Sequence, residues 1–267
     1  MEVNVENIKL AMLNIKSNFK NEKELKASFL ISIIGMTINN MAFLFLWFYF
    51  GKTVGSLNGW DALDVFGLYG FTTTSFGIFN TFFYGITKLP NYISSGNFDK
   101  YLLTPKSVLV KVATSSISTS AVGDTLFGII CFIIYAFNAK LTLLQLLFSF
   151  IFMITTTIVT FAFTLICMTV SFYLMDGYNV STGLYGLFLS NSLYHGGAFT
   201  GVLRIIFTFV IPSLLVGSLA VENVKNISLS GLLFMICTAI FWLIVSVIFF
   251  NKSLKKYESN SLFGFGG

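Results

Sequence analysis

Asp124 is the side chain of this sequence that could do chemistry deep inside an apolar segment. It is the only acidic residue well inside a long apolar run, and a charged aspartate at the centre of a membrane helix costs about 2.5–3.5 kcal/mol. It should therefore face the protein interior, a water-filled cavity or a partner. Two roles fit it: a structural hydrogen bond to a neighbouring helix, or a group that faces a substrate or a gate.

Residues that usually build catalytic or metal sites are scarce. His195 is the only histidine, which excludes a histidine-rich metal or phosphatase site. Cys131, Cys167 and Cys237 each lie in an apolar block without metal-binding spacing, so packing is their simplest role. No Gly-x-Ser-x-Gly element accompanies a serine nucleophile. We expect no enzyme, and no metal or cofactor bound by this chain.

One tripeptide, Gly51-Lys52-Thr53, resembles the end of a nucleotide-binding P-loop. Such a loop requires a glycine five residues before Gly51, where this chain has Leu46. We therefore exclude nucleotide binding at this tripeptide.

The elements that position these residues are expected to cross a membrane. Of the 267 residues, 55% are hydrophobic and 10% are charged, against about 25% charged in an average soluble domain. So few polar side chains cannot cover a water-facing surface, and most of the surface must face lipid. The first 28 residues lack the apolar core of a cleavable signal peptide, so the first span is expected to act as an uncleaved signal.

Six apolar runs are bounded by charged or turn residues and are interpreted as membrane spans. They cover residues 27–50, 64–87, 113–137, 144–173, 205–220 and 230–250. We expect an all-α integral membrane protein with a single polytopic domain over residues 1–267. Within it, residues 27–250 hold six transmembrane helices, residues 1–26 form an interfacial amphipathic helix, and residues 251–267 form a cytoplasmic tail.

The basic residues predict the orientation. With the N-terminus inside, thirteen lie in inner segments, Arg204 among them, and only Lys52, Lys140 and Lys225 lie in outer segments. This bias is typical of cytoplasmic loops, so both termini are expected in the cytoplasm. Lysine far outnumbers arginine, which fits an AT-rich bacterial genome and a bacterial cell membrane.

Residues 177–203 carry no charge and leave a seventh span open. A span within them, at about residues 180–194, would have an apolar core of only some 15 residues. It would also move the three lysines after the last span outside, and the charge bias would fall to ten against six. We therefore prefer six spans, with this stretch on the cytoplasmic side or re-entrant.

The N-terminal segment has an amphipathic pattern. Apolar residues recur every three or four positions, as on one face of a helix, at Val5, Ile8, Met12, Ile15 and Phe19. Lysines fall off that face, which favours a helix in the membrane interface, near anionic headgroups. A soluble partner-binding helix is the alternative.

The segment between the second and third spans is the other informative cytoplasmic piece. Pro90 suits the first turn of a helix, Gly96 a left-handed exit, and Pro105 a stop. We expect one or two short helices. They would present apolar side chains that need cover from lipid or another protein, namely Leu89, Tyr92, Ile93, Phe98, Tyr101, Leu102 and Leu103.

Four short motifs in order along the chain carry a resemblance to a known family. They are Gly96-Asn97-Phe98-Asp99-Lys100-Tyr101-Leu102-Leu103-Thr104-Pro105, Gly123-Asp124, Phe209-Val210-Ile211-Pro212 and Leu254-Lys255-Lys256-Tyr257-Glu258-Ser259. The chain resembles the membrane subunits, or permeases, of type-2 ABC transporters, the ABC-2 exporter superfamily. It departs from that family before the fifth span, where Tyr194-His195 replaces an expected Tyr-Pro pair.

The resemblance implies a half-transporter that does no chemistry itself. Two such subunits, identical or homologous, would form the pathway in the lipid membrane, for a drug, a peptide or a lipid-like amphipath. Each would bind a separate ATPase subunit carrying ATP and Mg²⁺, whose closing would bias the permease between two conformations. The implied coupling residues are Leu89, Pro90, Tyr92, Ile93, Gly96, Phe98, Asp99, Tyr101, Leu102, Leu103 and Pro105.

Polar residues inside the spans are candidates for the pathway or for helix interfaces: Asn39, Asn40, Asp124, Thr156 and Thr160. Small hydroxyl residues commonly let helices approach closely. A stand-alone six-helix secondary transporter or channel is the alternative function, but such proteins usually carry several ion-coupling charges in their spans. No nucleic-acid partner is expected.

Overall fold

The computed structural model describes residues 5–24, 26–103 and 105–257, which fold almost entirely into helices. The α-helices are α1 (Val5–Glu24), α2 (Lys26–Val54), α3 (Asp64–Phe83), α4 (Leu89–Ser94), α5 (Val108–Ala113), α6 (Ser120–Asn138), α7 (Leu143–Thr169), α8 (Gly177–Ser192), α9 (Gly201–Ile205), α10 (Ser213–Val216), α11 (Ser218–Lys225) and α12 (Leu229–Leu254). Short 3-10 turns cover Tyr84–Ile86, Asp99–Tyr101, Val170–Phe172 and Gly196–Ala198, and a π-helical turn covers Ile206–Val210.

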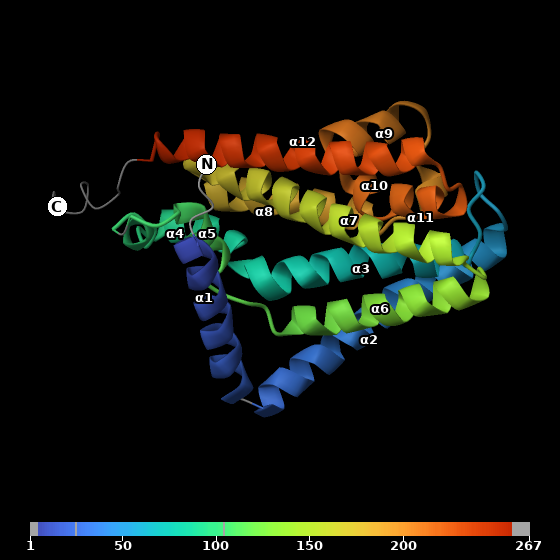
Figure 1. The fold of residues 1–267 in the computed structure, drawn as a ribbon, viewed down its shortest axis with the longest axis horizontal. Helices are drawn as coiled ribbons and strands as arrows, with labels where there is room; N and C mark the ends of the chain where they lie inside the picture. The colour runs from blue at the N-terminus through green and yellow to red at the C-terminus, as the bar shows by residue number, and fades with distance from the viewer. Residues whose placement is uncertain (1–4, 25, 104, 258–267) are drawn as a thin grey trace.

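Apart from α1, the long helices run along the length of one bundle (Figure 1). One end carries α4, α5 and the C-terminal end of α12, and we call it the α4 end. The opposite end carries α11 and the loop before α3, in which Leu57 and Trp60 form an isolated β-bridge. No longer strand occurs in the described ranges, which confirms the expected all-α architecture.

Within the described ranges, four helices are long and apolar enough to cross a membrane: α2, α6, α7 with the turn that follows it, and α12. Their apolar residues are continuous because lipid, unlike water, does not require a polar face. In α2 and α12 only 11% and 17% of the most apolar 18-residue window is buried within the chain. These helices therefore offer most of their surface to lipid or to another protein.

α3 lies inside the bundle, where fifteen of its twenty residues are buried. Glycine, threonine and serine in α3 let α6 pack directly against it. A Cβ added at Gly77 would lie 2.5 Å from the Thr125 backbone nitrogen, and one at Gly128 would lie 2.5 Å from that of Thr74. These small polar residues lower the hydropathy of α3, which is why it is not among the four strongly apolar helices.

The start predicted for the third span is wrong. α5 ends at Ala113, residues 114–119 are not helical, and α6 begins at Ser120. In the non-helical stretch the Ser118 backbone N–H donates to the Asn80 carbonyl of α3 at 3.0 Å instead of to a carbonyl of its own segment. Asp124 is consequently the fifth residue of its helix, not the eleventh.

The fifth span predicted at residues 205–220 is also wrong. Ile211 is extended (φ −118°, ψ 91°), and Pro212, which has no backbone N–H, separates the π-helical turn from α10. A second break at Gly217 separates α10 from α11. The segment forms short helices that fold back at the opposite end of the bundle (Figure 1).

Residues 177–203, expected on the cytoplasmic side or re-entrant, instead supply a lengthwise helix. α8 lies alongside α7 (Figure 1), and its first residues, Gly177 and Tyr178, share a cavity wall with Pro90 of α4. At its other end, Ser192 O accepts a hydrogen bond of 3.2 Å from Thr72 Oγ1. Contacts with its neighbours hold this 16-residue helix in place, although its own sequence is only moderately apolar.

The predicted tail is partly described. α12 continues beyond the expected end at residue 250 to Leu254. Residues 258–267 lie outside the described residues, as do residues 1–4 and 25 of the N-terminal segment and Thr104.

Candidate functional site

The loop at the α4 end forms the short helices expected from its prolines and glycine. Pro90 stands in the first turn of α4, and Gly96 has the left-handed φ of 70° that lets the chain reverse after it. The Asp99–Tyr101 turn follows. The interpretation that the whole apolar set is presented outward is wrong, because Leu89 and Phe98 are fully buried. The outward apolar pair is Leu102 and Leu103, which are 44% and 82% exposed.

Phe98 ties the loop to the rest of the bundle. Its ring lies 5.3 Å from that of Phe172, after α7, and 4.9 Å from that of Tyr257, after α12. Such edge-on aromatic pairs stabilise by about 0.5–1.5 kcal/mol each beyond the area that they bury. Phe98 therefore links the loop to the ends of α7 and α12.

Polar contacts hold the loop from its other side. Lys111 Nζ of α5 donates a hydrogen bond to the Tyr101 carbonyl, and the Tyr92 and Ser115 hydroxyls lie 3.1 Å apart. Burial raises the pKa of Tyr101 to about 12. The pKa of Tyr257 is also raised to about 12, mainly by burial and then by the neighbouring Asp99. Both phenols therefore stay protonated at neutral pH and keep their donor O–H groups.

α1 crosses the α4 end of the bundle and is fastened by asparagines (Figure 1). Asn14 Nδ2 donates to Thr114 Oγ1, and Asn18 Nδ2 donates to the Thr114 carbonyl, both at 3.1 Å. Asn7 Oδ1 accepts from the Ser107 backbone N–H. Val5, Ile8 and Met12, from the predicted apolar face, are exposed, which fits both an interfacial helix and the alternative of a partner-binding helix.

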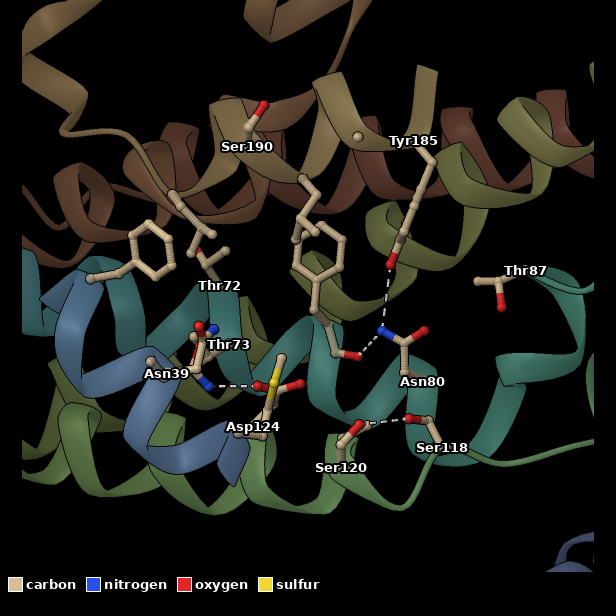
Figure 2. A pocket seen from close by; sticks show the side chains of 18 of the residues that line it. Asn39, Thr72, Thr73, Asn80, Thr87, Ser118, Ser120, Asp124, Tyr185 and Ser190 are labelled. Atoms are coloured by element: carbon tan, nitrogen blue, oxygen red, sulfur yellow. Dashed lines mark hydrogen bonds between the residues drawn. The ribbon is translucent and has the colours of Figure 1, made fainter. Parts of the chain in front are cut away.

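A groove of about 800 Å³ opens between α2 and α8, with α3 and α6 as its floor (Figure 2). Its volume is within the range of small-molecule sites. Hydroxyl and amide groups line the floor, including Thr72, Thr73, Asn80, Ser118 and Ser120. Aromatic side chains also line the groove, including Trp47 of α2, Tyr69 and Phe76 of α3, Tyr185 of α8, and Tyr194, which follows α8. The groove combines polar and apolar surface, as an amphipathic ligand requires.

Asn39, Asn40 and Asp124 all line this groove, so the structure brings together three of the predicted polar residues. Asn40 Nδ2 of α2 donates a hydrogen bond of 2.5 Å to Asp124 Oδ1 of α6. One residue earlier, a Cβ added at Gly123 would lie 2.6 Å from the Ile33 carbonyl of α2. The Gly123-Asp124 pair therefore lets α2 approach α6 closely and then fixes it there.

Thr156 and Thr160 lie elsewhere, in the packing of α7. Both are fully buried; Thr156 Oγ1 lies 2.7 Å from Ser75 Oγ of α3, and Thr160 Oγ1 bonds to the Thr156 carbonyl. Neither lines the groove. Of the two roles foreseen for these threonines, the structure supports helix packing.

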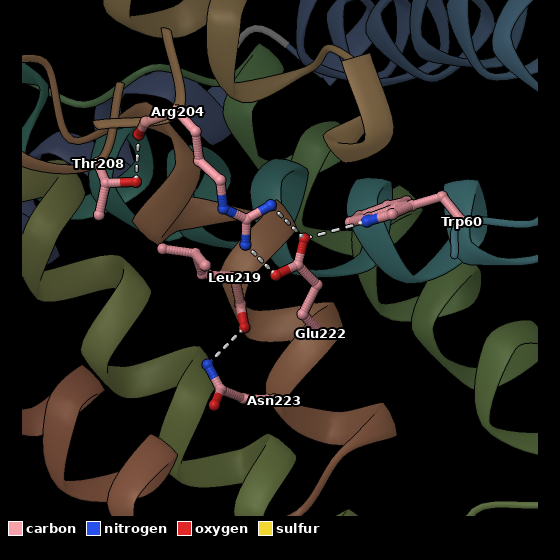
Figure 3. Close-up of polar contacts among 6 residues, drawn as sticks. All are labelled: Trp60, Arg204, Thr208, Leu219, Glu222 and Asn223. Carbon is pink, nitrogen blue, oxygen red and sulfur yellow. Dashed lines mark hydrogen bonds and ion pairs between the residues drawn. The ribbon is translucent and has the colours of Figure 1, made fainter. Parts of the chain in front are cut away.

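The opposite end is closed by a polar cluster. Glu222 of α11 pairs with Arg204 of α9 and accepts a hydrogen bond of 3.1 Å from Trp60 Nε1 (Figure 3). Lys225 Nζ lies 2.7 Å from Asp64 Oδ2, which fastens α11 to the start of α3. Arg204 therefore shares an end with Lys225, and the prediction that these two residues lie on opposite sides of the membrane is wrong.

His195 is 1% exposed and packs against Trp60, with ring centroids 5.1 Å apart. Burial lowers its pKa, with Asp64 opposing and Lys225 adding to that effect. Neither ring nitrogen has a hydrogen-bond partner among the described residues, so the side chain packs as a neutral ring.

Several groove residues were missed from the sequence. Thr72, Thr73 and Asn80 face the groove only because α3 lies between α2 and α8, and no local pattern distinguishes them from packing residues. Tyr185 was missed because its segment was expected on the cytoplasmic side or re-entrant. The absence of charge over residues 177–203 was the available signal.

Comparison with known proteins places most of the chain in one family. Residues 36–261 match the family model described as ABC-2 family transporter protein. No curated protein and no solved structure gives a significant match. The matched residues include the groove, the α4 loop and the cluster around Glu222.

Proposed function

This chain belongs to the ABC-2 family of transporters, and we propose that it is the permease subunit of an ATP-driven exporter in a bacterial cell membrane. The observation that carries the proposal is the pairing of two features on one chain. A groove of about 800 Å³ runs beside α2 and α8, and a rigid loop with an exposed leucine pair closes the α4 end. The first suits a translocation pathway, and the second suits the docking of an ATPase.

In this proposal six helices cross the membrane: α2, α3, α6, α7, α8 and α12. The α4 end is cytoplasmic, as are both termini. Moving Arg204 to the outer set changes the balance of basic residues from thirteen against three to twelve against four, which still favours this orientation. The crossing count of six is kept, with α8 in place of the segment first chosen.

The ATPase subunit would press on the α4 loop. Because Phe98 packs against Phe172 and Tyr257, a movement of the loop would reach α7 and α12 without passing through a flexible linker. ATP and Mg²⁺ would be held by the partner chain. The permease would switch between two conformations whose balance the bound nucleotide biases.

A second permease subunit would close the groove. On the α8 side, a Cβ added at Gly186 would meet no atom within 4 Å, so this part of α8 has room for a close neighbour. The α2 side is likewise unpartnered, with Ile34, Ile38 and Met41 exposed. Two copies facing each other across α2 and α8 would enclose a pathway lined by both grooves.

Purification from native membranes tests the ATPase partnership. The tagged chain should be recovered with a cytoplasmic ABC ATPase, and the complex should export cargo only with hydrolysable ATP. Recovery without any ATPase, together with transport driven by an ion gradient alone, would instead support the stand-alone transporter.

Cysteine cross-linking tests whether two subunits meet along α8. In a Cys237→Ala background, Gly186→Cys is expected to give a disulfide-linked dimer in native membranes, because α8 would meet its symmetry mate there. The matched control is the unmodified chain, whose exposed Cys237 lies on α12 away from the groove and should stay monomeric. Equal cross-linking from the two positions would contradict this subunit arrangement.

A further inference from the structure

The groove is lined by few charged side chains. Among the described residues that line it, Asp124 is the only acidic side chain and Lys88 is the only basic one. Lys88 lies in the loop before α4, with its ammonium 5.0 Å from the centre of the Tyr84 ring. Asp124 lies on α6 beside Asn40, so the middle of the groove carries a single carboxyl group (Figure 2).

One of the two carboxyl oxygens of Asp124 is hydrogen-bonded within the chain. Oδ1 accepts the Asn40 hydrogen bond, whereas the described residues supply no hydrogen bond to Oδ2. Asp124 is only 8% exposed and lines the groove. Burial therefore removes most of the water around Oδ2, and no described protein group replaces it. A carboxylate in such surroundings is stabilised strongly by a nearby positive charge or N–H donor.

The walls suit the same kind of ligand. Trp47 of α2, Tyr185 of α8 and Tyr194, which follows α8, line the groove together with Asp124 and are not fully buried. Aromatic faces attract cations as well as apolar groups. An anionic headgroup would meet the carboxylate without a compensating cation at that depth. A ligand with no polar group would leave Oδ2 unpaired when a second subunit excludes water.

We propose that the groove binds a cationic amphiphile, with its positive charge at Asp124 and its apolar part against the aromatic walls. That this ligand is the exported cargo rests on the proposed function. The binding itself depends only on this chain. Asp124 then has two tasks, since Oδ1 holds α2 in place and Oδ2 meets the ligand.

The test uses two ions of nearly identical shape and opposite charge, tetraphenylphosphonium and tetraphenylborate. Binding to the purified full-length chain in neutral detergent is measured by equilibrium dialysis, after subtraction of partition into empty micelles. The chain is expected to bind the cation, and Asp124→Asn is expected to weaken that binding at least about tenfold, the usual effect of losing one charge-assisted contact. Anion binding should stay weaker than cation binding and should not fall in the variant.

The variant isolates charge, because an asparagine oxygen at position 124 can still accept the Asn40 hydrogen bond. Asp61→Asn is the matched control, since it removes an exposed acid at the opposite end and should leave cation affinity unchanged. Asp124→Glu keeps the charge and should keep the preference for the cation, which covers the case in which the asparagine variant folds poorly. Equal binding of the two ions, or unchanged cation affinity in a folded Asp124→Asn chain, would overturn the proposal.

The outcome can be separated from the fate of the export function. If the ATPase is recovered but binding does not depend on charge, only the class of cargo is wrong. If charge-dependent binding is found but no ATPase is recovered, the groove site remains and the proposed coupling falls.

Discussion

Replacing Gly128 by leucine is expected to prevent the central helices from packing. A Cβ at this position would lie 2.4 Å from Thr74 Oγ1 and 2.5 Å from the Thr74 backbone nitrogen, so α3 and α6 would have to separate. Overpacking in a dense interior costs about 1–3 kcal/mol and more when backbone must move. Because α3 contacts α2, α6, α7 and α11, the loss should spread through the bundle. We expect a lower melting temperature in detergent and less protein in the membrane.

The matched control for this change is Gly35→Leu on α2. An added Cβ there would meet no atom within 4 Å, so the same side chain finds open space. Leucine also has the higher helix propensity, so this variant should melt at or above the temperature of the unmodified chain. Equal destabilisation by the two substitutions would show that α3 and α6 do not pack as closely as described.

Charging the exposed leucine pair of the α4 loop is expected to detach the ATPase. Leu102→Asp with Leu103→Asp places two carboxylates on the proposed docking surface, where they would have to be desolvated on binding. A loss of about 2 kcal/mol or more corresponds to roughly thirtyfold weaker binding, enough to abolish recovery of the ATPase in a pull-down. Folding should be preserved, because both side chains already face outward.

The adjacent pair at the start of α7 provides the control. Leu143 and Leu144 are 75% and 52% exposed but lie at the opposite end of the bundle. Leu143→Asp with Leu144→Asp adds the same charge and should leave recovery of the ATPase unchanged, provided that equal amounts of both variants reach the membrane. If the ATPase stays bound to the α4-loop variant, the docking surface lies elsewhere.

The helices that face lipid could be predicted from the sequence because lipid imposes a local rule. A helix in hydrocarbon needs about twenty apolar residues whatever its neighbours are, so α2, α7 and α12 were found near their observed positions. Pro90 and Gly96 act through the geometry of their own backbone, so the α4 turn was also predictable. The family resemblance rested on the same local motifs, and the match over residues 36–261 confirms it.

Helices buried among other helices follow no such local rule. α8 has only 16 residues and moderate hydropathy, and it is placed by α7, α10 and α4. Residues 205–220 looked apolar enough to cross, but Pro212 and Gly217 break them into short pieces that the Glu222 cluster holds at one end. In both segments tertiary contacts outweigh hydropathy, which explains why the fifth span was misplaced.

Asp124 shows where sequence and tertiary structure each contribute. Its type and its apolar surroundings are enough to establish that it needs a partner or a cavity, because an isolated charge in hydrocarbon is costly. Which of the two it has depends on residues far away in the chain. Asn40 lies 84 positions earlier, and Tyr185 of the facing wall lies well beyond it. The sequence alone therefore establishes a membrane protein with one exceptional carboxyl group, while only the packing of α2, α3 and α8 places that group at the floor of a groove.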